Sequence, residues 1–131
     1  MELNPCGFVL IDYFAVSPIL DVCATEKNSL CKYHYAENSL DKPYNLDFFC
    51  NPPYSEVKYW IRKCYLEHVK HNVSGLMLIF AKTDTIAWHE YIFGKAEILF
   101  LKGRLHFFQE GKESKHPAPY PSAIICFRKK L

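Results

Sequence analysis

The sequence predicts an α/β domain whose sheet is mostly parallel and closes on one antiparallel strand. Short apolar runs alternate along the chain with helical periodicity and polar connections, which is typical of this fold class. The strongest run, 75–81, is apolar on both faces, as buried parallel strands are. No internal repeat or domain boundary is visible in the 131 residues, so we expect a single domain over 1–131.

The first half of the chain predicts a helix and three strands. The apolar run 8–14 indicates a helix within residues 1–16, which Ser17-Pro18 ends. The strands cover residues 19–24, 31–35 and 46–50, with a turn-rich connection over 37–43. Asp21 lies inside the first strand, where an unpaired carboxylate is costly to bury. We therefore expect Asp21 at the tip of its strand, with hydrogen-bond partners.

The second half predicts one long helix, one short helix and three strands, of which 75–81 is the first. Apolar side chains at helical spacing indicate a helix over 55–71. Residues 83–93 predict a polar loop and a short helix that Gly94 closes, followed by strands over 96–101 and 122–127. About twenty residues rich in Gly, Lys, His and Pro connect the last two strands, and such a long structureless connection is usually functional.

The composition indicates a folded, soluble protein. Half of the residues are hydrophobic and 16% are aromatic, which excludes a disordered chain. The formal net charge of +2 is too small to indicate a nucleic-acid partner by itself. No signal peptide opens the chain, and its apolar runs are too short to span a membrane. We therefore expect a cytoplasmic protein with no membrane partner.

The cysteines predict reduced thiols. The chain has 6 cysteines without a CxxC pair, and most of them lie within apolar strand or helix patterns. A zinc site built from Cys23, Cys31, His34 and Cys50 fits no standard ligand spacing. We therefore expect mostly buried thiols and no metal.

The strongest functional signal is Asn51-Pro52-Pro53-Tyr54, between the strand over 46–50 and the helix over 55–71. Two prolines cannot continue a strand, so the backbone turns out at the strand's carboxyl end, where open α/β sheets bind ligands. The Asn51 side-chain oxygen and the Pro52 carbonyl are placed to accept the hydrogens of an aromatic amine and draw its nitrogen toward tetrahedral geometry. Tyr54 would stack on the base, which must leave its duplex to be reached. The alternative is a simple turn followed by a capping serine.

Several segments in a fixed order carry a resemblance to a known family. They are Leu20-Asp21-Val22-Cys23-Ala24, Asn51-Pro52-Pro53-Tyr54-Ser55, residues 78–85 with Trp88-His89, Lys102-Gly103-Arg104-Leu105-His106-Phe107, and Pro119-Tyr120-Pro121-Ser122-Ala123. Across about residues 8–128 the chain resembles the phage-type DNA adenine-N6 methyltransferases, which use S-adenosylmethionine. The resemblance implies a Rossmann-like fold, methyl transfer to adenine N6 in DNA, and a phage or prophage origin.

The resemblance also implies roles for individual residues. Asn51, Pro52, Pro53 and Tyr54 match the catalytic motif. The residues implied to contact S-adenosylmethionine are Asp21, Cys23, Ala24, Asn38, Leu40 and Asn51. Lys102 and Arg104, with Lys112 and Lys115 in the following loop, resemble the DNA-facing stretch and suit phosphates.

Three features depart from the family pattern. The Trp-x-Thr-Pro segment with which the family usually opens has no match, and we expect the chain to start after it. The glycine-rich loop of many Rossmann-like folds is missing after Asp21, where Thr25-Glu26 follows Ala24. Residues 80–82 are Phe-Ala-Lys, where a turn with proline is common.

Two alternative functions remain open at this point. Cytosine N4, an RNA base and a protein glutamine also present a planar NH₂ group, although the basic loop and the lack of an appended substrate domain favour DNA. The other alternative is a degenerate, non-catalytic nucleic-acid-binding protein that has lost its cofactor.

Overall fold

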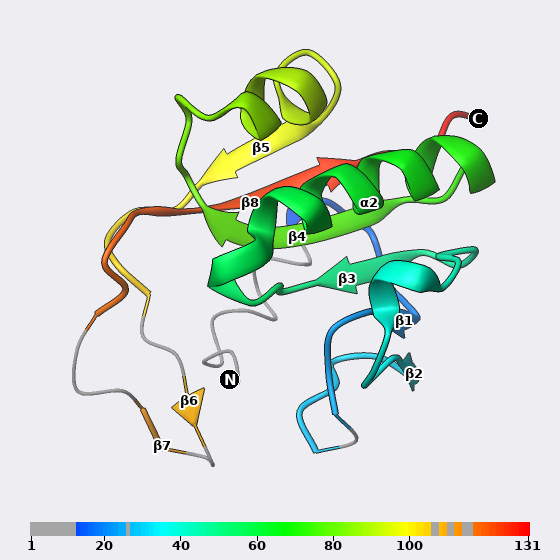
Figure 1. The fold of residues 1–131 in the computed structure, drawn as a ribbon, viewed down its shortest axis with the longest axis horizontal. Coiled ribbons are helices and arrows are strands. Elements are labelled where there is room, and N and C mark those ends of the chain that lie inside the picture. The colour runs from blue at the N-terminus through cyan, green and yellow to red at the C-terminus, as the bar shows by residue number, and fades with distance from the viewer. Residues whose placement is uncertain (1–12, 26, 106–107, 110–111, 114–116) are drawn as a thin grey trace.

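The computed structural model describes residues 13–25, 27–105, 108–109, 112–113 and 117–131. They form a six-stranded mixed sheet with one long helix across a face (Figure 1). The strands of this sheet are β1 (Leu20–Asp21), β2 (Tyr33–His34), β3 (Phe48–Cys50), β4 (Gly75–Phe80), β5 (Glu97–Phe100) and β8 (Ser122–Phe127). They lie in the order β2-β1-β3-β4-β8-β5. The α/β fold class is confirmed.

The sheet is parallel on one side and antiparallel on the other. Strands β2, β1, β3 and β4 pair in parallel, whereas β8 pairs antiparallel with both β4 and β5. The predicted antiparallel strand is thus confirmed, but its predicted place is wrong. It lies between β4 and β5 instead of closing the sheet, and β5, which comes earlier in the chain, forms the edge.

The long helix α2 (Val57–His71) follows a 3-10 turn, η2 (Tyr54–Glu56), and ends at Asn72, whose φ of 49° is left-handed. This confirms the predicted helix over 55–71. The predicted short helix is a π-helical turn, η3 (Trp88–Ile92), and Gly94 follows it with a φ of 78°. The 3-10 turn η1 (Ser39–Asp41) packs near α2. Up to residue 12, the predicted N-terminal helix lies outside the described residues.

The connection between β5 and β8 contains regular structure that the sequence did not predict. Strands β6 (Phe108–Gln109) and β7 (Lys112–Glu113) pair antiparallel in a small separate sheet. The expectation of a structureless connection is therefore wrong for these residues. Nowhere in the described ranges is there a helix long and apolar enough to cross a membrane.

Alternating side chains of the central strands fill two hydrophobic layers. Cys50, Met77 and Ile125 belong to the cluster that packs with α2. Phe49, Leu76 and Ile124 belong to a second cluster on the other face, together with Phe14 and Val16 from before β1 and Ala118 from before β8. The predicted burial of both faces of the strand over 75–81 is confirmed.

Gly75 leaves room for the Phe48 ring where β4 begins. It pairs with Phe48, and a Cβ atom on Gly75 would lie 2.1 Å from Phe48 Cζ. Because the Phe48 ring is fully buried, it has little room to move away. A glycine is therefore required at this point.

Candidate active site

Strands β1 and β3 end side by side, and this brings two predicted segments together. Asp21 pairs with Phe49, and the Val22 N–H donates to the Phe49 carbonyl at 3.0 Å. The chain after β1 therefore lies beside Asn51, the first residue after β3. Pro53 is extended, with φ −63° and ψ 144°, and leads into η2. The predicted elbow at the carboxyl end of this strand is confirmed.

A cavity of about 320 Å³ lies between these two strand ends. Its lining comprises Cys23, Asn28, Asn51, Pro52, Pro53 and Tyr54. The two asparagine amides offer both donors and acceptors, and the prolines and the thiol give apolar surface. Burial raises the pKa of the Cys23 thiol, so the thiol stays neutral. This composition suits a ligand that is polar at its edges and carries a positive charge or none.

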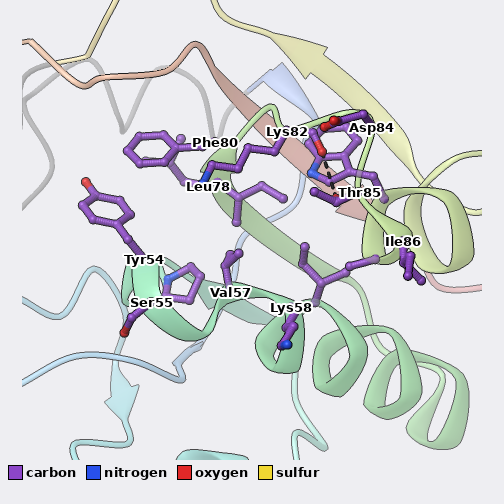
Figure 2. Close-up of a pocket in the computed structure, with 15 residues that line it drawn as sticks. Tyr54, Ser55, Val57, Lys58, Leu78, Phe80, Lys82, Asp84, Thr85 and Ile86 are labelled. Atoms are coloured by element: carbon purple, nitrogen blue, oxygen red, sulfur yellow. Dashed lines mark hydrogen bonds between the residues drawn. The ribbon is translucent and has the colours of Figure 1, made fainter.

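A second cavity, of about 540 Å³, lies on the α2 side of the tetrapeptide (Figure 2). Its apolar walls come from Val57, Ile61, Leu78, Ile79, Ala87 and Trp88. Figure 2 shows Tyr54 and Phe80 at one end of it and Ile86 at the other. Pro52 and Tyr54 line both cavities. The tetrapeptide therefore forms a wall shared by the two cavities, so that a ligand in one cavity can lie next to a ligand in the other.

Tyr54 lies at the junction of the two cavities and is 42% exposed. Its ring stacks on the Phe80 ring, with centroids 4.4 Å apart. Burial raises the pKa of the Tyr54 phenol to about 12, so the hydroxyl keeps its proton at neutral pH. The chemistry that Tyr54 offers is an aromatic surface and a neutral hydroxyl.

Asp21 lies at the carboxyl end of β1 with its side chain buried. Its Oδ1 accepts the Cys23 N–H at 3.3 Å and its Oδ2 accepts the Leu30 N–H at 3.2 Å. The predicted hydrogen-bond partners are confirmed, and they are backbone groups of the loop. Burial raises the pKa of the Asp21 carboxyl, although these two N–H groups act in the opposite direction. Asp21 thus shapes the loop that carries Cys23 and Asn28.

The other predicted cofactor residues are Ala24, Asn38 and Leu40, and none of them lines the cavity next to Asn51. Ala24 donates its N–H to the Tyr35 carbonyl at 3.2 Å, next to the loop after β1. Asn38 is exposed in a left-handed conformation before η1, and Leu40 packs on the core below α2. Neither Asn38 nor Leu40 lines the cavity that holds Asn51. Their contact with a cofactor stays a prediction.

The predicted DNA-binding residues are only partly covered by the described ranges. Lys102 and Arg104 are exposed on either side of Gly103, whose φ is 76°. Arg104 donates Nη1–H to the Ala118 carbonyl at 3.4 Å, which ties the two ends of the connection together. Lys112 belongs to β7, but its side chain lies outside the described part, as does the whole of Lys115.

Five of the cysteines lie within the described part of the chain. No group of three or more His, Cys, Asp or Glu residues is placed there to hold a metal ion. Cys23, Cys31, Cys50, Cys64 and Cys126 are free thiols, and the last three are buried.

Sequence reasoning missed two residues of this region. Asn28 lines the smaller cavity, and its Oδ1 accepts the Thr25 N–H at 2.7 Å. The three-residue spacing of Thr25 and Asn28 was the available signal, since Asx side chains often bond to backbone three positions away. In the sequence Phe80 stands out only as a departure from the family pattern, and no local signal indicates that it reaches Tyr54.

Comparison with protein families matches residues 8–131 to the family described as DNA N-6-adenine-methyltransferase (Dam). The chain belongs to this family. No curated protein matches the chain. Membership of the Dam family identifies an adenine-specific DNA methyltransferase, and it implies S-adenosylmethionine as methyl donor and DNA as substrate. The match covers the tetrapeptide and both cavities.

Proposed function

We propose that this Rossmann-like domain transfers a methyl group from S-adenosylmethionine to the N6 amine of an adenine that has left the DNA duplex. The observation that carries the proposal is the place of Pro52 and Tyr54 between two cavities. Direct transfer needs both substrates in line, with the acceptor amine next to the methyl group. A wall shared by two cavities meets that need.

The smaller cavity is the proposed cofactor site. S-adenosylmethionine supplies a methyl group that its sulfonium charge already makes electrophilic. Asn28 and Asn51 offer amide groups for the polar edges of the cofactor. None of the lining residues that the structure describes is basic, which suits a cation. Asp21 holds the loop after β1 in place, because its carboxyl group accepts hydrogen bonds from the Cys23 and Leu30 N–H groups. Its role in cofactor binding is therefore to position the loop.

The larger cavity is the proposed adenine site. The N6 amine is placed at the wall that the two cavities share, since Asn51 lines the smaller cavity and Pro52 lines both. There Asn51 Oδ1 and the Pro52 carbonyl accept the two hydrogens of the amine, which draws the nitrogen toward tetrahedral geometry and frees its lone pair. Bound S-adenosylmethionine would supply the methyl group: the S–C bond would break as the N–C bond forms, and its electron pair would stay on sulfur. The nitrogen then releases one proton to water. Tyr54 stacks on the base and holds it in line.

Methyl transfer from labelled S-adenosylmethionine to unmodified DNA tests this proposal, with the modified nucleoside identified by mass spectrometry. We expect N6-methyladenine from the wild-type chain and a loss of roughly 10²–10³ in kcat for Asn51→Ala, as for other groups that stabilise a transition state. Asn45→Ala is the matched control, because Asn45 is exposed before β3. Equal activity of Asn51→Ala and wild type contradicts the role of Asn51.

The alternatives give different results in the same experiments. Label in N4-methylcytosine, in RNA or in protein glutamine identifies another amino group as the substrate. Titration with S-adenosylmethionine tests the degenerate alternative, since no binding at millimolar cofactor would support it. The proposal requires binding that Asn28→Ala weakens and Asn45→Ala leaves unchanged.

A further inference from the structure

Lys82 stands in a turn that fixes its backbone at the wall of the larger cavity. Its N–H donates to the Phe80 carbonyl at 2.9 Å. Its carbonyl accepts two hydrogen bonds from Thr85, from the N–H at 3.2 Å and from Oγ1 at 2.8 Å. Such a turn presents the lysine side chain from a defined point.

The ammonium group of Lys82 is placed by an aromatic ring. Nζ lies 4.4 Å from the centroid of the Tyr120 ring, within the range of a cation–π contact. Tyr120 contacts Phe80 with centroids 5.4 Å apart, and Phe80 stacks on Tyr54. In Figure 2 the Lys82 side chain extends from the end of β4 toward Phe80. A positive charge is therefore linked to Tyr54, the proposed base-stacking residue, through the rings of Tyr120 and Phe80.

No carboxylate neutralises this charge among the residues that the structure describes. Asp84 also lines the cavity, but it forms no ion pair with Lys82. The other lysine of the cavity, Lys58, belongs to α2 on the opposite wall, and its Nζ lies over the Tyr59 ring. Lys82 is thus an exposed cation at the mouth of the cavity, and its ammonium group lies next to the Tyr120 ring.

We propose that Lys82 binds a DNA phosphate next to the extruded adenine, and that Tyr120 is the positioning residue that holds the ammonium group there. This inference rests on the proposed function. A nucleotide that leaves the base stack turns its flanking phosphates toward the mouth of the pocket that receives its base. A lysine at that mouth neutralises one of them and releases a counterion. This contact is separate from the phosphate contacts that the sequence predicts for Lys102 and Arg104 in the connection after β5.

Salt-dependent binding of a fluorescein-labelled duplex with one mismatched adenine tests the inference. The mismatch lowers the cost of extrusion, so no recognition sequence is needed. Anisotropy is measured at several salt concentrations without methyl donor. We expect the slope of log K against log salt to be shallower by about 0.9 for Lys82→Gln, the effect of one lost phosphate contact, and unchanged for Lys82→Arg. A wild-type slope for Lys82→Gln overturns the inference.

Two controls separate this contact from general surface charge. Lys129 is exposed beyond Phe127, which pairs with Gly75 at the far end of β4 from Phe80. A slope change for Lys129→Gln as large as that for Lys82→Gln overturns the inference. For the positioning role, Tyr120→Leu should weaken binding about two- to fivefold and Tyr120→Phe should not, because only the ring is needed. Equal effects of these two variants contradict that role.

The inference and the proposed function fail in different ways. If the wild-type chain methylates adenine while Lys82→Gln keeps the wild-type slope, the Lys82 contact alone is wrong. If the duplex binds with the expected slopes but no N6-methyladenine forms, the proposed transfer is wrong and the phosphate contact stands as a DNA contact.

Discussion

The Tyr54 ring stacks on the Phe80 ring with centroids 4.4 Å apart and an interplanar angle of 15°. The two residues come from different elements, since Tyr54 begins η2 and Phe80 ends β4. A partner that lies face to face on a ring fixes its plane, because tilting separates the two π surfaces. Phe80 is therefore a positioning residue for the ring on which we propose that adenine stacks.

Removal of the Phe80 ring should lower the activity on DNA more than the affinity for S-adenosylmethionine. Stacked aromatic pairs contribute about 0.5–1.5 kcal/mol, so we expect Phe80→Leu to lower kcat/KM for DNA about two- to tenfold. The affinity for S-adenosylmethionine, measured by calorimetry, should not change, because Phe80 does not line the smaller cavity. Phe80→Tyr keeps the ring and should restore activity. An equal loss of cofactor affinity would show a general structural role instead.

The Tyr54 hydroxyl should not take part in proton transfer. Burial raises its pKa to about 12, so the phenol stays protonated up to a higher pH than an ordinary tyrosine. An ordinary tyrosine has a pKa of about 10. We therefore expect the pH profile of kcat to show no step near pH 10 that arises from Tyr54. Tyr54→Phe should keep most of the activity, whereas Tyr54→Ala should lose the stacking surface. A limb near pH 10 that disappears in Tyr54→Phe would contradict this.

Asn28 should contribute to cofactor affinity. It lines the smaller cavity, and a neutral hydrogen bond contributes about 0.5–1.5 kcal/mol. We expect Asn28→Ala to weaken S-adenosylmethionine binding about two- to tenfold by calorimetry, while anisotropy shows unchanged DNA binding. Asn28→Asp keeps the acceptor for the Thr25 N–H and controls for the shape of the loop. Unchanged cofactor affinity in Asn28→Ala would remove Asn28 from the site.

The buried carboxyl of Asp21 should make stability depend on pH. Its pKa is raised in the folded chain, so the folded state binds this proton more tightly than the unfolded state does. Its contribution to stability is therefore fully present below the unfolded pKa of 3.8 and is lost as the pH rises through the higher folded value. Urea unfolding between pH 4 and 7 should show that the free energy of unfolding of wild type falls relative to Asp21→Asn. A constant difference contradicts this sign.

The local pattern of the sequence predicted burial and the main elements well. The helix over 55–71 and the strands over 75–81 and 122–127 were predicted because their apolar spacing or length is unambiguous. The tetrapeptide was placed correctly at the end of its strand, because two prolines leave the backbone no other course. Hydrogen bonds for Asp21 were predicted from the cost of burying its charge.

Contacts between segments that are distant in the sequence could not be predicted from local residue patterns. The position of β8 inside the sheet depends on which strand edge it meets, and the composition of β8 is the same at an edge or at the centre. The stack of Tyr54 on Phe80 and the place of Lys82 over Tyr120 arise only when η2, β4 and the segment before β8 meet. Asn28 enters the cavity because Asp21 folds its loop back.

The central place of β8 has a consequence for how this methyltransferase folds. β8 comes after β4 and β5 in the chain, yet both of these strands pair with it. Its pairing with β4 runs from Gly75 with Phe127 to Phe80 with Ser122. The sheet therefore cannot assemble in chain order, and the closure of such long loops slows folding. During synthesis the edges of β4 and β5 remain unpaired until the later residues 122–127 leave the ribosome. Over that interval the nascent chain is open to proteases and to strand pairing with other chains.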